Sequence, residues 1–288
     1  MSDLSGRYIV DTSWLAQQLG SPDLVVLDGS WYLPAEKRDP KAEYAAEHIP
    51  GAVFFDIDEI SDETSHLPHM LPSAVKFASR MKSLGIGDGS RIVAYDGSSL
   101  GLMSAARVWW MFRAMGHEDI AVLDGGLRKW KAEGRPVTAE PSALRSQRHF
   151  TPRANAALIR DLDDMRDVVA KGRAQIVDAR GPGRFAGTEP EPRPGLRSGH
   201  IPGARNLPFG TLLNPDGTLK SAGEMAAVFE RAGIDVGKPI VTSCGSGVSA
   251  AVLSLALAVL GRPDVGLYDG SWSEWGQQSL DTEVATGA

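Results

Sequence analysis

The sequence predicts an α/β protein made of two tandem domains, each a mostly parallel sheet with helices on both faces. Two observations lead to this prediction: the chain contains an internal repeat, and in each half short β-branched runs alternate with amphipathic helical runs. A chain of 288 residues is long for one hydrophobic core and suits two domains. Short apolar strands separated by helices are typical of parallel strands that are buried on both faces.

The repeat rests on five pairs of landmarks at a nearly constant offset. They are His-Ile-Pro-Gly-Ala at residues 48–52 and 200–204, the Trp-ending motifs at 123–130 and 268–275, the N-cap-like Asp11 and Asp161, and the apolar runs at 25–28 and 176–178 and at 92–96 and 240–244. Such self-similarity indicates a duplicated domain. We place the domains at residues 1–138 and 156–288 and a linker at 139–155, in a Pro/Arg/Ser-rich stretch without periodicity.

Three strands are expected in each half. They are residues 24–28, 91–95 and 120–123 in the first half, and 174–178, 239–243 and 265–268 in the second. Ligands of such sheets bind at the carboxyl ends of the strands. Cys244 falls at one of these ends, and Asp96 takes the matching place in the first half. Because a carboxylate cannot replace a thiol, we expect an active site in the second half alone and interpret Asp96 as a turn or cap residue.

Cys244 is the only cysteine of the chain. It stands between a predicted strand and an Ala/Leu/Val-rich helical stretch at 249–260, in a loop of small residues. This arrangement points backbone N–H groups inward and adds the positive partial charge of a helix N-terminus, which favours a thiolate. The neighbouring glycines let the backbone come close to whatever the sulfur carries. A lone cysteine is more often a small buried hydrophobe, but this context favours a nucleophile.

Composition excludes several classes of function. The net charge of −6 provides no global basic field that would attract nucleic acid. No apolar run is long enough to span a bilayer, and the first residues lack the apolar core of a signal peptide. A single cysteine excludes an intramolecular disulfide and suits a reducing compartment, so we expect a cytoplasmic protein. No His/Cys spacing indicates a metal site and no glycine-rich nucleotide motif precedes a helix, so no cofactor is expected.

The motifs resemble those of the rhodanese-like sulfurtransferases over nearly the whole chain. The resemblance rests on the tandem halves, the two His-Ile-Pro-Gly-Ala turns, Asp-Gly-Gly-Leu at 124–127, Asp-Gly-Ser-Trp at 269–272 and Cys-Gly-Ser-Gly-Val-Ser-Ala at 244–250. It implies two tandem rhodanese-like domains, of which the first lacks the catalytic cysteine. Members that prefer thiosulfate resemble Cys-Arg-Lys-Gly, with two cations for a dianion, whereas Cys-Gly-Ser-Gly is similar to members that use 3-mercaptopyruvate. The expected donor is therefore 3-mercaptopyruvate, and the alternative is thiosulfate:cyanide sulfurtransfer.

The resemblance also implies a mechanism. Thiolate Cys244 takes the sulfur of 3-mercaptopyruvate as a persulfide, pyruvate leaves, and an acceptor thiol, such as thioredoxin or glutathione, or cyanide removes the sulfur. Backbone N–H groups of the loop would hold the outer sulfur; the loop residues expected to bind are Gly245, Gly247, Val248 and Ser249. Ser249 stands where the family usually has Thr, and both residues carry a hydroxyl group.

Two arginines match the family's substrate-binding loop. By resemblance, Arg184 and Arg193 hold the carboxylate and the keto oxygen of the substrate. Guanidinium groups suit planar, bidentate recognition of oxygen. Without the resemblance, arginines in such a Pro/Glu-rich loop would be interpreted as solvated or as paired with Glu189 or Glu191.

A further match lies in the first half. By resemblance, Asp58, His69 and Ser246 form a Ser-His-Asp relay across the domain interface that polarises the substrate carbonyl or manages the proton on the leaving enolate. Ser246 is not the nucleophile, because Cys244 is far the better one. His66 is close in sequence, but the Met-Leu-Pro that follows His69 decides for His69.

Two other classes of protein share parts of this pattern. Cysteine phosphatases use the same strand–loop–helix geometry, but they need an arginine six positions after the cysteine, where this chain has Ala250. A non-catalytic persulfide carrier would need no substrate pocket, so the matches at Arg184, Arg193, Asp58 and His69 speak against it.

Overall fold

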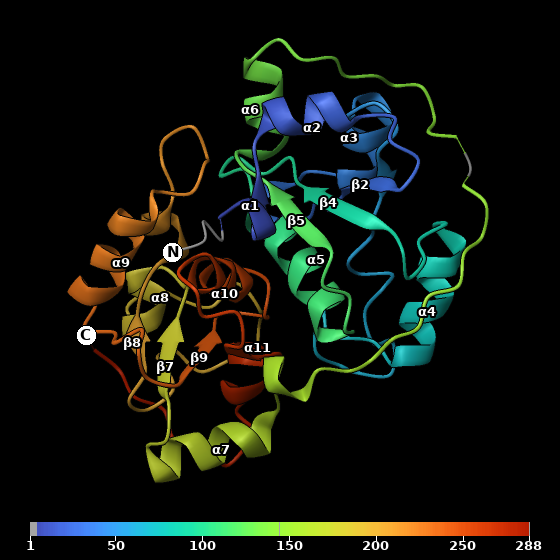
Figure 1. Ribbon diagram of the computed structural model, residues 1–288. Coiled ribbons are helices and arrows are strands. Elements are labelled where there is room, and N and C mark those ends of the chain that lie inside the picture. Colours follow the sequence, from blue (N-terminus) through green and yellow to red (C-terminus); the bar gives the residue numbers. More distant parts are fainter. Residues whose placement is uncertain (1–4, 144, 288) are drawn as a thin grey trace. The chain divides into compact units, whose positions relative to one another are not determined.

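The chain forms two compact units, described by a computed structural model for residues 5–143 and 145–287 (Figure 1). The first unit contains the chain up to Glu63, Leu71–Asn155 and Leu213–Leu219. The second unit contains Thr64–Met70, Ala156–Leu212 and the chain from Lys220 onward. Two short segments, 64–70 and 213–219, therefore belong to the unit of the other sequence half.

The first unit is built on a parallel sheet of five strands in the order β1-β5-β4-β2-β3. The strands are β1 (Ile9–Val10), β2 (Leu24–Asp28), β3 (Val53–Phe54), β4 (Arg91–Tyr95) and β5 (Ile120–Leu123). The helices are α1 (Ser5–Tyr8), α2 (Thr12–Gln18), α3 (Pro40–Ala46), α4 (Ala74–Ser83), α5 (Met103–Ala114) and α6 (Gly126–Ala132), with a short 3₁₀ turn, η1 (Pro34–Glu36). Leu15 of α2 and Trp130 of α6 pack with alternate strand residues on one face, and α5, which contacts β4 and β5, covers the other.

The second unit repeats this topology strand for strand, in the order β6-β10-β9-β7-β8. The strands are β6 (Ile159–Arg160), β7 (Gln175–Asp178), β8 (Arg205–Asn206), β9 (Ile240–Ser243) and β10 (Gly266–Tyr268). The helices are α7 (Leu162–Lys171), α8 (Pro182–Ala186), α9 (Ala222–Arg231), α10 (Ala250–Val259) and α11 (Ser271–Trp275), with 3₁₀ turns η2 (Ala156–Leu158) and η3 (Phe209–Leu212). The predicted fold class, two tandem α/β domains with mostly parallel sheets, is confirmed.

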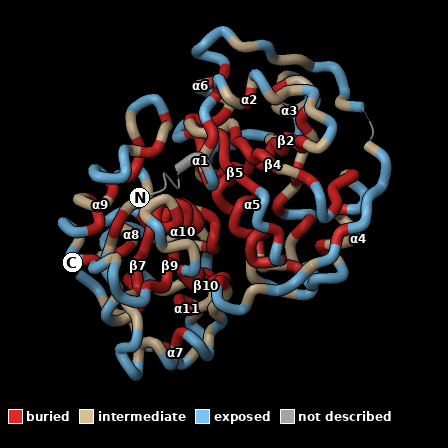
Figure 2. Tube along the Cα trace, in the orientation of Figure 1, coloured by how far each residue is buried: buried red, intermediate tan, exposed pale blue. Residues whose placement is uncertain are grey.

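Burial explains why the central strands and two of the helices form where they do. Helices α5 and α10 are buried almost along their whole length, and Figure 2 shows them in the same burial class as the central strands. Helix α10 is apolar on all sides, as expected of a helix without a solvent-facing surface. Its burial fixes the position of its N-terminus, where the loop that contains Cys244 ends.

The segment 139–155, expected as a linker, packs against the first unit. Phe150 is buried and its ring centre lies 5.5 Å from that of Phe77. Arg145 donates from Nη2 to the carbonyl of Leu24 at 2.7 Å. These contacts hold the segment along the surface of the unit instead of leaving it as a solvated tether.

Candidate active site

Cys244 follows β9, and the loop 244–249 leads from it to α10, with Ser249 at the N-cap. The thiol is buried, at 1% exposure. Gly247 has φ +74°, a left-handed conformation that glycine adopts without steric cost. Several backbone N–H groups of this loop donate no hydrogen bond within the described part of the chain: those of Gly245, Ser246, Val248 and Ser249. The loop therefore offers donors beside the sulfur that can bind negative charge.

The corresponding loop of the first unit provides an internal comparison. There the carboxylate of Asp96 accepts the N–H of Ser98 at 2.9 Å. It also accepts the N–H groups of Ser104 at 2.8 Å and Ala105 at 2.9 Å, in the first turn of α5. Asp96 is thus a cap, as predicted, and the N–H groups of this loop bind a carboxyl group of their own chain. In the second unit Cys244 stands at that place.

The turn that begins α11 holds the loop of Cys244 from the side. The N–H of Trp272 donates to the carbonyl of Cys244 at 3.0 Å. Ser273 donates to the carbonyl of Gly245 from both its N–H, at 2.8 Å, and its hydroxyl, at 2.7 Å. The hydroxyl of Ser271 accepts the N–H of Cys244 at 3.2 Å. The sequence prediction missed Ser271 and Ser273. The repeat could have indicated them, because the first half has Gly126 and Arg128 at the matching positions and only the half with the cysteine has serines there.

Arg184, on α8, lies against the loop and is also paired. A Cβ atom at Gly245 would lie 2.9 Å from its Nη2. The same Nη2 is 2.5 Å from Oε2 of Glu191, whose side chain is only 2% exposed. Glu191 also binds Arg180 at 2.8 Å, and Arg180 binds Asp178 at 2.6 Å. Of the two carboxylates considered from the sequence, the structure selects Glu191, and this buried network fixes the direction of the Arg184 guanidinium.

His69 and Arg193 meet in the second unit, because segment 64–70 belongs to it. Nη2 of Arg193 lies 3.3 Å from Nε2 of His69. Arginine has only donors, so Nε2 is the acceptor in this contact. His69 is 5% exposed and has φ +63°, whereas His66 is exposed and lines an open groove of about 400 Å³ together with Arg193.

Two residues with a strained backbone contact residues of the predicted site. Three non-glycine residues of the described chain have positive φ, namely Lys37, His69 and Ser271. Such conformations cost on the order of 1–3 kcal/mol each and cluster at functional sites. One of the three interacts with Arg193 and another binds the backbone of Cys244.

Asp58 lies in the first unit and Ser246 in the loop of the second. Oδ2 of Asp58 accepts the indole N–H of Trp31 at 3.1 Å. Ser246 is buried and follows Cys244 by two residues. The contact of His69 that the structure describes is with Arg193, and the relay of Asp58, His69 and Ser246 stays a prediction.

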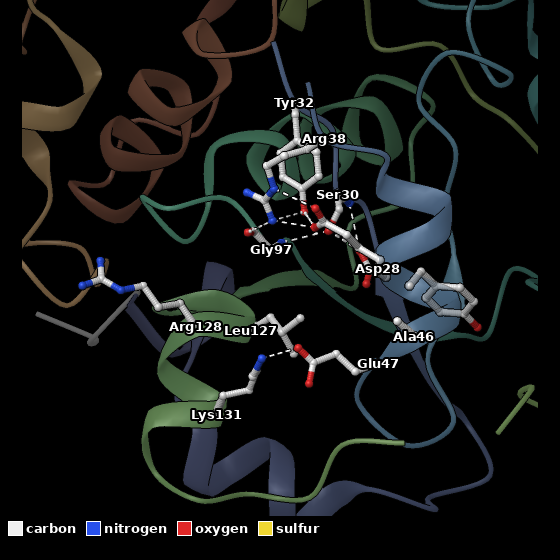
Figure 3. A pocket seen from close by; sticks show the side chains of 12 residues that line it. Asp28, Ser30, Tyr32, Arg38, Ala46, Glu47, Gly97, Leu127, Arg128 and Lys131 are labelled. Atoms are coloured by element: carbon white, nitrogen blue, oxygen red, sulfur yellow. Dashed lines mark hydrogen bonds and ion pairs between the residues drawn. The ribbon is translucent and has the colours of Figure 1, made fainter. Parts of the chain in front are cut away.

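A cavity of about 670 Å³ lies in the first unit beside Gly97, the residue that follows Asp96 (Figure 3). Its polar groups bind one another. Arg38 pairs with Glu43 at 2.5 Å and its guanidinium lies 3.6 Å from the ring centre of Tyr32. The hydroxyl of Tyr32 donates to Glu43 at 2.7 Å. In the first unit, polar side chains beside the loop that corresponds to the loop of Cys244 are thus hydrogen-bonded to one another.

The described residues form neither a metal-binding cluster nor a membrane-spanning helix. No group of three or more His, Cys, Asp or Glu side chains in residues 5–143 and 145–287 is arranged to hold a metal ion. Over the same residues, no helix is long and apolar enough to cross a membrane.

The fold and the loop of Cys244 define a class of protein that sequence comparison also finds. The family model described as "Rhodanese-like domain" matches residues 11–133 and 161–278. The chain therefore belongs to the rhodanese-like family, and the resemblance drawn from the motifs is confirmed.

Two different enzyme names occur among the similar proteins. The chain is 44% identical to human 3-mercaptopyruvate sulfurtransferase, over 96% of this chain and 95% of that protein. It is 45% identical to thiosulfate sulfurtransferase of Cricetulus griseus, over 98% and 96%. Among solved structures, SseA from Escherichia coli, described among 3-mercaptopyruvate sulfotransferases, superposes with a TM-score of 0.83 at 41% identity, over 93% of this chain and 99% of that one. Tum1 of Saccharomyces cerevisiae gives 0.88 at 34%, over 97% and 98%.

Proposed function

We propose that this protein is a sulfurtransferase that moves the sulfur of 3-mercaptopyruvate, through a persulfide on Cys244, to an acceptor and releases pyruvate. The observation that carries the proposal is the loop of Cys244, which has N–H groups without hydrogen-bond partners among the described residues and a thiol at the position where the first unit has the carboxyl group of Asp96. The relatives support sulfur transfer under both donor names. The choice of donor rests on the loop, which has Gly245 and Ser246 in place of cationic side chains.

The reaction balances in two steps. The thiolate of Cys244 attacks the sulfur of 3-mercaptopyruvate, a sulfur–sulfur bond forms, and the carbon–sulfur bond breaks. The electron pair of the broken bond goes to the enolate of pyruvate, which takes up a proton. An acceptor thiolate or cyanide then attacks the outer sulfur and leaves Cys244 as a thiolate again. The N–H groups of Gly245, Val248 and Ser249 stabilise the negative outer sulfur of the persulfide, and Gly247 supplies the left-handed turn of the loop.

Two arginines bind the donor in this proposal. Arg184 lies beside Gly245 and is held by Glu191, so its guanidinium reaches the loop in a fixed direction. Arg193 lies beside His69. Together they hold the carboxylate and the keto oxygen, while Asp58, His69 and Ser246 relay the proton that the enolate takes up.

The acceptor in the proposal is a thiol, of thioredoxin or of glutathione, with cyanide as the assay substitute. The two steps of the proposal balance with Cys244, the donor and the acceptor alone, so the proposal includes no cofactor. A reducing compartment, which we propose to be the cytoplasm, keeps the single cysteine available.

We expect kcat/KM for 3-mercaptopyruvate to exceed that for thiosulfate when both donors are measured with the same acceptor. A dianion finds only backbone dipoles at residues 245 and 246. The double substitution Gly245→Arg with Ser246→Lys should move the preference toward thiosulfate. The new Cβ would also displace the Arg184 guanidinium, 2.9 Å away, and so weaken 3-mercaptopyruvate binding. A wild-type preference for thiosulfate would instead establish the alternative, a thiosulfate:cyanide sulfurtransferase.

Arg184→Gly and Arg193→Gly should each raise KM for 3-mercaptopyruvate about ten- to a hundredfold, since a charge-assisted hydrogen bond contributes roughly 1.5–3 kcal/mol. Thiosulfate has no carboxylate, so its slower turnover should change less. Arg173→Gly, at an exposed arginine of the second unit, serves as the control in the same assay. Equal losses on both donors would show that the two arginines support the fold instead of the substrate.

A further inference from the structure

Ser271 occupies a backbone conformation that favours glycine. It is fully buried and has φ +49°. In the first unit the repeat places Gly126 at the same position, with φ +55°. The two units thus share the left-handed conformation, but only the unit with the cysteine carries a side chain there. A serine at such a position is strained relative to glycine. We therefore expect its hydroxyl group to have a role that offsets this strain.

The hydroxyl of Ser271 joins β10 to the start of the loop. It donates to the carbonyl of Tyr268 at 2.7 Å and accepts the N–H of Cys244 at 3.2 Å. The next residue, Trp272, binds the carbonyl of Cys244 at 3.0 Å. Both backbone polar groups of the cysteine are therefore held by two successive residues of one turn.

The first unit keeps only one of these two bonds. Leu127, the counterpart of Trp272, donates its N–H to the carbonyl of Asp96 at 3.0 Å. Gly126 has no hydroxyl, and a Cβ atom there would collide with the carbonyl oxygen of Gly101. The bond to the N–H group is thus a feature of the unit that carries the thiol.

We propose that Ser271 is a positioning residue for sulfur transfer, which fixes the backbone of Cys244 so that its sulfur faces the open N–H groups of the loop. With the N–H and the carbonyl both held, the direction of the Cα–Cβ bond is set and only the side-chain torsion is left. The persulfide then forms where the loop can bind it. The inference rests on the proposed role of Cys244.

The test compares Ser271→Gly with Ser254→Ala. Glycine keeps the left-handed backbone and removes only the hydroxyl. Ser254, on α10, is also buried and its hydroxyl lies 2.9 Å from that of Thr242, so its loss controls for removing a buried hydroxyl of the same unit. Ser271→Ala is a second variant, which keeps the Cβ atom in case glycine loosens the turn.

We expect Ser271→Gly to melt close to wild type and to lower kcat for 3-mercaptopyruvate about tenfold, the usual scale for losing one neutral hydrogen bond, with little change in KM. Alkylation of the only cysteine by iodoacetamide should slow as well, while Ser254→Ala stays near wild type in both assays. Unchanged kcat and alkylation in Ser271→Gly and Ser271→Ala would overturn the inference. So would losses that follow the melting temperature equally in the Ser271 and Ser254 variants.

Alkylation needs no sulfur donor. If wild-type protein released no pyruvate from 3-mercaptopyruvate, the proposed function would fail, and a slower alkylation of Ser271→Gly would still support the positioning of Cys244. Normal wild-type activity with unchanged variants would leave the proposed function standing and remove Ser271 from it.

Discussion

Cys244→Ser is expected to give a folded protein that transfers no sulfur from 3-mercaptopyruvate. The thiol is buried between β9 and α10, and serine differs from cysteine by one atom of similar size, so the fold should persist. A serine hydroxyl is a weak nucleophile without an adjacent base and cannot form a persulfide. Because the chain has no second cysteine, no other thiol can substitute. We expect pyruvate release to fall to the uncatalysed rate, a loss of at least about 10³-fold in kcat.

Pyruvate release and intact mass together check this prediction. Wild-type protein incubated with 3-mercaptopyruvate should gain one sulfur atom, about 32 Da, and lose it again with dithiothreitol, as a persulfide does. Cys244→Ser should gain nothing. Equal melting curves of the two proteins provide the control for folding. Pyruvate release by the serine variant above the uncatalysed rate would contradict the assignment of the nucleophile.

The central strands could be predicted because they are continuous apolar runs between turns. The predicted strand at 91–95 is β4 as observed, and the one at 239–243 begins one residue later, as β9. Strands β1, β3, β6 and β8 were missed. Each of these strands has only two residues, which are too few to show any periodicity. All four lie at the edges of their sheets.

The assignment of segments 64–70 and 213–219 to the unit of the other sequence half could not be predicted either. The sequence places residues 64–70 in the first half, yet they pack with the second unit. Which core a loop joins depends on contacts distant in sequence, which local patterns do not encode. His69 therefore lies in the same unit as Cys244 and Arg193, and the interaction with Arg193 became visible only in the structure.

In the candidate site, too, features encoded by local sequence could be predicted and contacts that depend on the fold could not. The loop at 244–250 was predictable because its chemistry is local: a thiol, small residues and a helix N-terminus. The partners of Arg184 were not, because the sequence left both Glu189 and Glu191 open and the choice depends on the direction of α8 and on the position of Arg180. Ser271 was missed because its proposed role depends on its positive φ angle and on the hydrogen bond that its hydroxyl accepts from the N–H of Cys244, 27 positions away. Local sequence patterns indicate neither.

The last prediction concerns the relay. His69→Asn should lower kcat for 3-mercaptopyruvate by roughly 10²-fold or more, the usual range for losing a group that manages a proton. Asparagine tolerates the left-handed backbone of His69 at φ +63°, so the variant should melt within a few degrees of wild type. Alanine would add strain at this buried position and is the poorer test. Because Arg193 loses a partner, a moderate rise in KM should accompany the loss of kcat.

Comparison of variants and donors then separates a relay from a structural role. Ser246→Ala should resemble His69→Asn, and the double variant should be little worse than either, since groups that act as a unit are not additive. Asp58→Ala should be milder, because the imidazole survives and loses only its orientation. Thiosulfate releases sulfite, which needs no enolate protonation, so turnover of thiosulfate should fall less than turnover of 3-mercaptopyruvate. Full activity of His69→Asn on 3-mercaptopyruvate would remove the relay and leave Cys244, the backbone donors of its loop and the two arginines as the whole mechanism.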